Sequence, residues 1–507
     1  MSNSTGEQSL FQTSTQDESC ERTESHRVWL RPMRWPRSVW ISLIVFAFVS
    51  MPFCSRWWFL SHVPNVAEPE DLQRLLARKV SDKDNAFTHY RAADMMRSKA
   101  LIDWRGRDST PLPPGYSELY STVLRDGLSR LGEADESFLA AQRPSLDEWL
   151  RGTEISEFQP FTADQMSAMT LLPVHGTARQ FIATARVEAL RCIESGDMDD
   201  AWRWLRACVR FTGHLNQYSG LVQRNIGAAA HYRTSVGIVR WAEHPAVTVD
   251  QLQQALRDIR AEYALNPPFS ESLKVEFLLS RQMFLSREWA DSKKGMFYGR
   301  PAWEERLTAA RGPAFWVVAE PELSLRVERQ RLVNLLNEID KPLWLRTSQS
   351  TKQEFLFDLD PNVPRKPGQL DPRLIEQGQK TSVLKNILGP RWIGVKPVDK
   401  EVWLERSRQA ALETLLALQA YRRDHGTYPE SLEALIPTYL ESLPIDPCDP
   451  TGRPIRYRRD STNSASVWNI GLDGQDDDGR ELNIDEDDQY RSPTSNPDVG
   501  FEVKFAE

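Results

Sequence analysis

Residues 178–213 read ARQFIATARVEALRCIESGDMDDAWRWLRACVRFTG, and this stretch decides the fold class. Apolar residues recur every three or four positions on both sides of Gly196-Asp197, a pair typical of turns. The pattern predicts two helices joined by a short turn. Small residues, such as Ala185 before the turn and Ala201 after it, would let the helices approach closely. The stretch therefore predicts an antiparallel helical hairpin.

The same helical periodicity extends over residues 66–345. Thr248 and Gln251 have the spacing of a capping box, which opens many helices. A further apolar stripe runs through residues 322–339. The hairpin is similar to a single tetratricopeptide-type unit, but no second copy follows at that period. No run of alternating strands interrupts the region, so we expect one helical domain over residues 66–345.

Two segments lack this periodicity. Residues 1–37 are rich in Ser, Thr, Gln and Glu and end in arginines, so we expect a disordered tail. Prolines accumulate between residues 346 and 400, where we expect a linker.

The C-terminal residues 401–507 change pattern again. Residues 402–421 form a long apolar helix with two apolar flanks, so the helix should be packed from more than one direction. Gly426 is placed to end it, because glycine tolerates the left-handed conformation. Strand candidates follow at residues 455–457, 467–470 and 500–505. The order predicts an α+β module in which a small antiparallel sheet packs on one long helix.

Residues 38–60 are predicted to form a transmembrane helix. Residues 38–55 contain no charged side chain and would span about 27 Å as a helix. Tryptophans occur at both ends, as at membrane interfaces. Five arginines lie between residues 22 and 37, so the positive-inside rule places the N-terminus in the cytoplasm and the rest of the chain outside it.

Three alternatives to a transmembrane helix fit parts of this segment. A cleaved signal peptide would have a short basic start and a small-residue cleavage site, whereas a long polar leader stands here. Cys54 could be a lipoprotein cysteine, although Met51, Pro52 and Phe53 do not favour lipidation. A buried core helix is also consistent with the apolar run.

Length, net charge and cysteine spacing limit the number of domains and the kinds of partner that we expect. The 507-residue chain is long enough for two or three domains. Its net charge of -8 argues against nucleic acid as a partner, because phosphate binding needs a concentrated basic surface. The five cysteines include no CxxC pair and no metal-ligand spacing, so we expect free thiols.

The C-terminal residues occur in an order shared with a known family. The ordered pieces are Tyr421-Arg-Arg-Asp424-His-Gly426-Thr-Tyr428-Pro429, Leu443-Pro444-Ile-Asp446-Pro447, Gly452-Arg-Pro454-Ile-Arg-Tyr457 and Ile470-Gly471-Leu-Asp473-Gly474. This order resembles the periplasmic domain of the major pseudopilin of type II secretion systems, over residues 400–507. The resemblance implies a long helix with a small sheet, and an association with envelope assembly. A pseudopilin carries its membrane segment at the start of this helix, whereas here the apolar segment lies at residues 38–60.

The acidic loop after the second strand candidate suggests a metal site. Asp473, Asp476, Asp477 and Asp478 lie among glycines, and closely spaced carboxylates are the ligands that calcium prefers. The resembled family also binds calcium near this place, with a different spacing. The pattern raises the hypothesis that these four residues bind calcium, although an acidic loop of this kind is more often a solvated surface.

The sequence contains no catalytic motif that we can assign. It has no HExxH pair, no GxSxG elbow and no phosphate-binding loop. We therefore expect a membrane-anchored, non-enzymatic envelope protein that binds other proteins. The alternative is an envelope enzyme whose site lies in the helical domain.

Overall fold

The computed structural model describes residues 36–62, 65–106, 116–162, 173–285, 321–342, 395–472, 474–479, 482 and 498–505. The chain divides into two compact units, Met1–Cys54 and Ser55–Glu507. Most of the predicted tail and most of the predicted linker lie outside the described residues.

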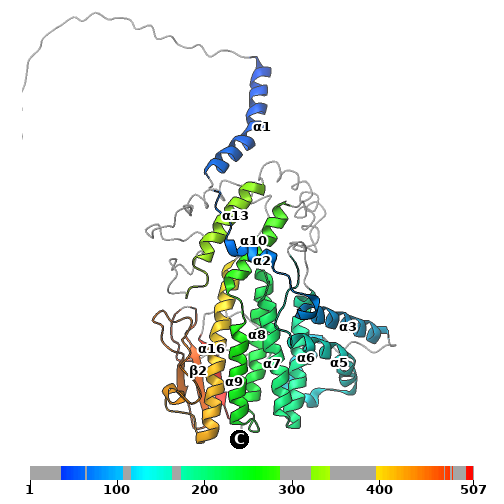
Figure 1. Ribbon diagram of the computed structural model, residues 1–507, viewed down its shortest axis with the longest axis vertical. Helices are drawn as coiled ribbons and strands as arrows, with labels where there is room; N and C mark the ends of the chain where they lie inside the picture. Colours follow the sequence, from blue (N-terminus) through cyan, green and yellow to red (C-terminus); the bar gives the residue numbers. More distant parts are fainter. Residues whose placement is uncertain are drawn as a thin grey trace, which may run out of the picture. The chain divides into compact units, whose positions relative to one another are not determined.

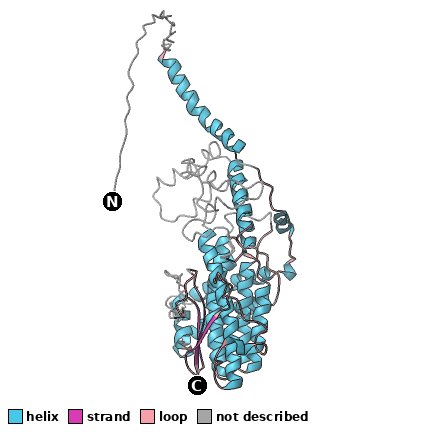
Figure 2. Ribbon diagram, turned by 90° about the vertical axis from the view of Figure 1, so that its left-hand side faces the viewer, coloured by secondary structure: helices cyan, strands magenta, loops and turns pink. Residues whose placement is uncertain are grey.

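The described chain is mainly helical with one small sheet, as predicted (Figures 1 and 2). Its helices are α1 (Arg37–His62), α2 (Glu70–Ala77), α3 (Ala86–Gly106), α4 (Tyr116–Asp126), α5 (Glu133–Thr153), α6 (Pro173–Ser195), α7 (Met198–Asn216), α8 (Leu221–Glu243), α9 (Val249–Ala264), α10 (Phe269–Leu285), α13 (Pro321–Leu336) and α16 (Val395–His425). Short 3-10 turns lie at Asp82–Asp84, Leu128–Arg130 and Leu432–Leu435. The strands are β1 (Arg456–Arg459), β2 (Ser464–Asn469) and β3 (Val499–Lys504).

Helices α6 and α7 form the hairpin predicted from residues 178–213. Gly196 has a φ of +84°, the left-handed conformation that ends a helix. Asp197 then opens α7 by accepting a hydrogen bond from the backbone N–H of Asp200. The predicted capping box is also confirmed, because Thr248 and Gln251 cap α9 reciprocally.

Helix α8 packs closely on α7 through glycine. A Cβ added to Gly227 would lie 2.0 Å from Oδ1 of Asn216, and one added to Gly237 would lie 2.9 Å from a methyl carbon of Leu205. Real side chains do not approach so closely, so a larger residue at either position would force Asn216 or Leu205 to move.

The C-terminal part has the predicted α+β layout. The sheet has the order β1-β2-β3 with antiparallel pairs, and Val467 lies opposite both Tyr457 and Phe501. Gly426 ends α16 with a φ of +79°, as predicted. Helix α16 begins earlier than expected, at Val395 within the predicted linker. Pro397 is compatible with this start, because proline is tolerated in the first turn of a helix.

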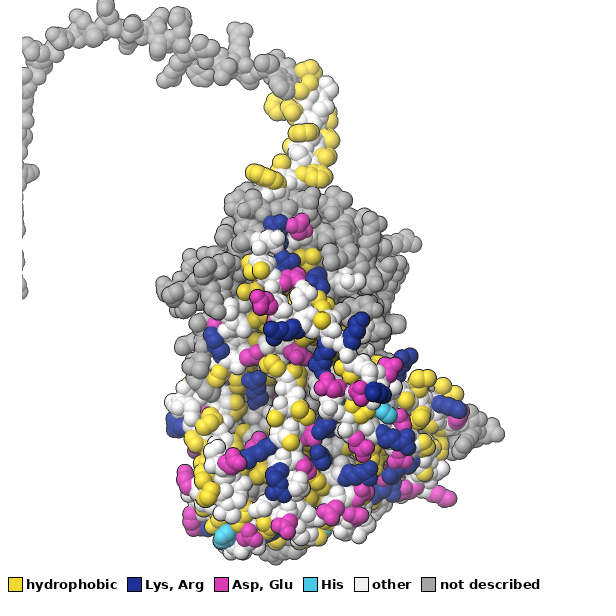
Figure 3. Space-filling model, in the orientation of Figure 1, with side chains coloured by type: hydrophobic (Ala, Val, Ile, Leu, Met, Phe, Trp, Pro, Cys, Tyr) yellow, Lys and Arg dark blue, Asp and Glu magenta, His cyan; other side chains and the backbone are white. Residues whose placement is uncertain are grey.

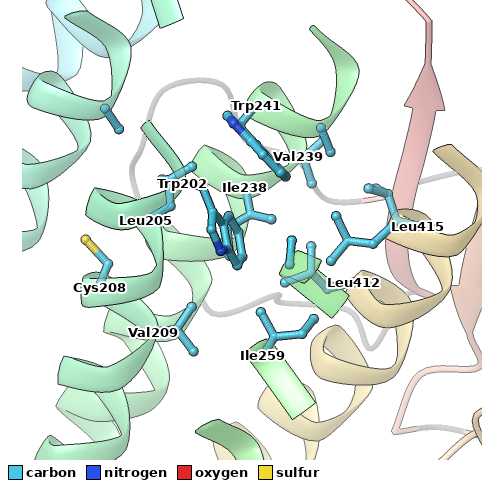
Figure 4. Close-up of a cluster of buried hydrophobic side chains, with 14 of the residues drawn as sticks. Trp202, Leu205, Cys208, Val209, Ile238, Val239, Trp241, Ile259, Leu412 and Leu415 are labelled. Carbon is cyan, nitrogen blue, oxygen red and sulfur yellow. The ribbon is translucent and has the colours of Figure 1, made fainter. Parts of the chain in front are cut away.

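One hydrophobic core joins α16 to the preceding helices and to the sheet. Helix α16 contacts α8 and α9, and it also contacts β2 and β3. In Figure 4, Leu412 and Leu415 of α16 lie beside Ile259 of α9 and Ile238 of α8. The same cluster of buried side chains extends to Phe501 in β3.

Residues 37–62 form helix α1, but the transmembrane span predicted over residues 38–60 is not supported. Among the helices of the described ranges, none is long and apolar enough to cross a membrane. Several side chains of the segment, including those of residues 55, 56 and 58–62, lie outside the described set. Most of the described apolar side chains of α1 are exposed (Figure 3).

The close contact of α7 with α8 gives a stability prediction. Replacing Gly227 by alanine should destabilise the protein by about 1–3 kcal/mol, because the new methyl group meets Asn216. Gly176 in α6 is the matched control, since a Cβ there meets nothing within 4 Å. Gly176→Ala should be neutral or stabilising by up to about 1 kcal/mol, because alanine favours helices. Urea denaturation measures both changes, and equal effects would contradict the packing described here.

Candidate functional site

The acidic loop predicted to bind calcium turns tightly beside strand β2. Gly474, Asp478 and Gly479 have φ values of +72°, +58° and +63°, all in the left-handed region. A Cβ on Gly479 would lie 2.9 Å from the indole ring of Trp468. Glycine is therefore needed where the loop passes over this ring.

A cluster of three carboxylates surrounds Arg456 of β1, next to this loop. Its Nη1 donates to Oδ2 of Asp446 at 2.8 Å, and its Nη2 donates to Oδ2 of Asp449. Its Nε reaches Oδ2 of Asp476 at 3.4 Å. We call these four residues the Arg456 cluster. One guanidinium thus connects two residues before the sheet with the acidic loop after β2.

Asp446 is the most enclosed member of the Arg456 cluster. It is fully buried and accepts the backbone N–H groups of Cys448 at 2.8 Å and of Ile470 at 2.9 Å. Burial raises the pKa of its carboxyl to about 6, although these hydrogen bonds and Arg456 act against the rise. Asp446 therefore ties two loop backbones to β1 through its two oxygens.

Asp449 shows the opposite balance. Burial would raise its pKa, but hydrogen bonds from Thr451 and Arg456 outweigh burial and lower the pKa to about 2. Oδ1 of Asp449 accepts from both the backbone N–H and the hydroxyl of Thr451. Asp449 is therefore ionised near neutral pH and supplies the charge that Arg456 needs.

Protein groups already engage both oxygens of Asp476. Oδ1 accepts from Nε1 of Trp468 at 2.9 Å and from the backbone N–H of Asp478 at 3.2 Å, while Oδ2 faces Arg456. Arg458 lies over the Trp468 ring and donates to the backbone oxygen of Asp478. The loop is thus held to the sheet by arginine and tryptophan side chains.

Asp498 supports the loop from the other side. It is buried, and its Oδ2 accepts the backbone N–H groups of Asp477 at 3.0 Å and of Gly479 at 2.8 Å. Among the described residues, its Oδ1 is buried without a hydrogen-bond partner, and burial raises the pKa of the group. Asp498 thus fixes the loop backbone rather than its side chains.

The structure describes three of the four aspartates that were predicted to bind calcium. Asp476, Asp477 and Asp478 are described, whereas Asp473 lies outside the described residues. In the part of the chain that the structure describes, no three His, Cys, Asp or Glu side chains are grouped so that they could hold a metal ion. Calcium binding by the four aspartates therefore stays a prediction.

Sequence reasoning missed Arg456, Asp449 and Asp498 as partners of this loop. A weak signal was available, because Asp446 and Asp449 each precede a proline and stand shortly before an arginine in a strand. Spacing alone does not show that the loop after β2 returns to the same arginine.

A second polar contact joins α16 to the helical body. Glu405 of α16 lies 2.5 Å from a guanidinium nitrogen of Arg224 in α8 and accepts from Nδ2 of Asn216 at 3.3 Å. All three side chains are buried. Burial would raise the pKa of Glu405, but the charges of Arg224 and His231 and the hydrogen bonds from Arg224 and Asn216 together lower it below its usual value. The pair fixes where α16 crosses α7 and α8.

Arg423 at the other end of α16 binds the C-terminus of α8. Its Nη2 donates to the backbone oxygens of Ala242 at 2.9 Å and of His244 at 2.8 Å, and its Nε donates to that of Val247. Carbonyl groups at a helix end lack partners within the helix, so this arginine satisfies them. Glu243 completes the contact by accepting the backbone N–H of Lys504 at 2.9 Å.

We compared the chain with known proteins and found no relative. Neither the protein-family models, nor the curated proteins, nor the solved structures include a match to this chain.

The Arg456 cluster gives a prediction with an internal control. Arg456→Met should destabilise the protein by about 3 kcal/mol or more, because it leaves the buried Asp446 without its cation. Arg453→Met should cost less than about 1 kcal/mol, since Arg453 is exposed and lies 3.6 Å from Asp449. Chemical denaturation at neutral pH compares the two. Equal losses would show that Arg456 does not organise the cluster.

Acid should weaken the helical body through buried His231, which pairs with the hydroxyl of Tyr263 at 2.9 Å. Burial lowers the pKa of His231 from 6.5 to about 4. The unfolded state therefore binds more protons between these pH values, so the free energy of unfolding falls by up to about 3 kcal/mol as the pH drops through that window.

Burial raises the pKa of Asp446 to about 6 and that of Glu243 to about 7. These two carboxyl groups therefore bind more protons in the folded state, so they increase the free energy of unfolding as the pH falls, which is opposite to the effect of His231. The contribution of His231 is isolated by His231→Gln, which should lose less stability than the wild type between pH 7 and pH 4.5. Parallel pH profiles of the two proteins would refute it.

Calcium binding is testable through stability. If Asp473, Asp476, Asp477 and Asp478 hold calcium, the free energy of unfolding should rise by about 2.7 kcal/mol at a hundredfold excess over the dissociation constant. Asp476→Asn with Asp478→Asn should abolish this response. A magnesium solution of equal ionic strength controls for screening. Identical melting in calcium and in chelator would favour the solvated loop.

Proposed function

We propose that the protein is a membrane-attached, non-enzymatic envelope component that binds other proteins, and that α1 attaches it to the bilayer. The observation that carries the attachment is the exposed apolar surface of α1. Trp40, Phe46 and Phe48 are 55%, 69% and 80% exposed. Exposed apolar surface of this kind is typical of membrane or protein contact.

The described charged clusters favour a role in binding other proteins over a role in catalysis. The charged groups of the Arg456 cluster and of the Glu405–Arg224 contact bind one another and backbone groups, and so hold elements of the fold together. The resemblance of residues 400–507 to a type II secretion pseudopilin also favours an assembly role. That resemblance is of sequence order, and a shared fold alone would not carry a function.

Vesicle flotation tests the attachment. The full chain should float with phosphatidylcholine vesicles, whereas Phe46→Glu with Phe48→Glu should stay at the bottom of the gradient, because charged side chains do not enter the apolar layer. Leu265→Glu is the control, since Leu265 at the end of α9 is also exposed, at 48%. The attachment is refuted if the wild type fails to float or if the double variant floats equally well.

The orientation and the binding role need their own measurements. A reporter active only outside the cytoplasm should give signal at residue 507 and none at residue 1. Cross-linking in intact membranes should recover protein partners. Recovery of none, together with substrate turnover by the purified protein, would favour the envelope enzyme instead.

A further inference from the structure

The chain that leaves α1 is fixed to the body almost at once. Arg329 of α13 donates to Oδ1 of Asn65 at 2.5 Å and to the backbone oxygen of Val66 at 3.2 Å. These contacts begin three residues after His62, the last residue of α1.

Arg281 and Lys274 of α10 bind acidic residues that follow Val66. Arg281 of α10 lies 3.1 Å from Oε2 of Glu68, and Arg329 reaches Oε1 of the same carboxylate at 3.4 Å. Lys274 of α10 pairs with Asp71. We call Lys274, Arg281 and Arg329 the tether clamp. All three are partly buried, so solvent screens these pairs less than it screens exposed ones.

Apolar packing also attaches residues 72–78 to the helical body. Leu72 is fully buried, in one cluster with side chains of α10 and α13. The hydroxyl of Tyr218 donates to the backbone oxygen of Leu75 at 2.6 Å, and Arg78 lies over the ring of Tyr218. Residues 65–78 are therefore part of the packed body and not a free linker.

Chain length limits the distance between the end of α1 and the clamp. Asn65 is three steps along the chain from His62, and an extended chain covers at most about 3.6 Å per step. Asn65 therefore lies within about 11 Å of the end of α1. If α1 ends at the boundary of the hydrocarbon layer, Asn65 lies within the headgroup region or just beyond it.

We propose that the tether clamp holds the part of the body formed by α10 and α13 against a lipid headgroup surface. The inference rests on the proposed attachment through α1. Without the clamp, residues 65–71 would lose these fixed contacts, and the body would move away from the bilayer more freely.

Two measurements on the full chain test the clamp. Amide hydrogen exchange of residues 65–71 reports whether the segment is held. Cross-linking from a photoreactive phosphatidylethanolamine headgroup in phosphatidylcholine vesicles reports whether α10 and α13 lie at the surface. Glu68→Ala removes the ion pairs that Arg281 and Arg329 form with this carboxylate, while the contacts of Arg329 with Asn65 and Val66 stay. Glu322→Ala is the control, because it removes the same charge from α13 but only breaks an exposed pair with Arg326.

Glu68→Ala should speed exchange of residues 65–71 about tenfold and reduce headgroup cross-links to α10 and α13 roughly threefold. Glu322→Ala should resemble the wild type. A charge exchange provides an independent check: Asp71→Lys should also speed exchange, and adding Lys274→Asp should restore slow exchange.

Each contrary result has a distinct meaning. Exchange in Glu68→Ala equal to that in Glu322→Ala would overturn the clamp. Faster exchange with unchanged cross-links would overturn its role in holding the body at the lipid. Failure of the wild type to bind vesicles would overturn the proposed attachment, while the exchange data would still judge the clamp by itself.

Discussion

The packing of α16 between the helical body and the sheet is the contact on which the rest of the unit from Ser55 to Glu507 depends. Leu412 and Leu415 enter the core formed by α7, α8 and α9, while the same helix supports β2 and β3. Without α16 the strands β2 and β3 would lose the helix that covers most of their apolar side, and burial of that apolar surface is the main term that stabilises the sheet. The sheet therefore owes its stability to the helices, and the acidic loop owes its position to the sheet.

The charged residues inside this packing mainly fix the position of α16 relative to its neighbours. Glu405 and Arg224 are buried together, and Arg423 binds backbone oxygens at the end of α8. Buried ion pairs add little net stability, because removing two charges from water costs about as much as their attraction returns. Their effect is on specificity, since any shift of α16 would leave a buried charge without its partner. Asp446 and Arg456 do the same for the loops around β1.

Local features of the fold could be predicted from the sequence, whereas long-range contacts could not. The hairpin at Gly196, the cap at Thr248 and the end of α16 at Gly426 each depend on a few adjacent residues, and all were correct. The two apolar flanks of residues 402–421 predicted packing from more than one direction, but periodicity cannot identify the partners. For the same reason, the acidic loop was found as a feature while its link to Arg456 was not.

The central claim is that the helical body and the sheet share one core and unfold together. Native-state hydrogen exchange in increasing urea tests it most directly, by following amides in α7 and in β2 of the same protein. The account predicts that the most protected amides of both elements exchange with the same free energy of opening and the same dependence on urea. Amides of β2 that open at clearly lower free energy, while those of α7 stay protected, would contradict it.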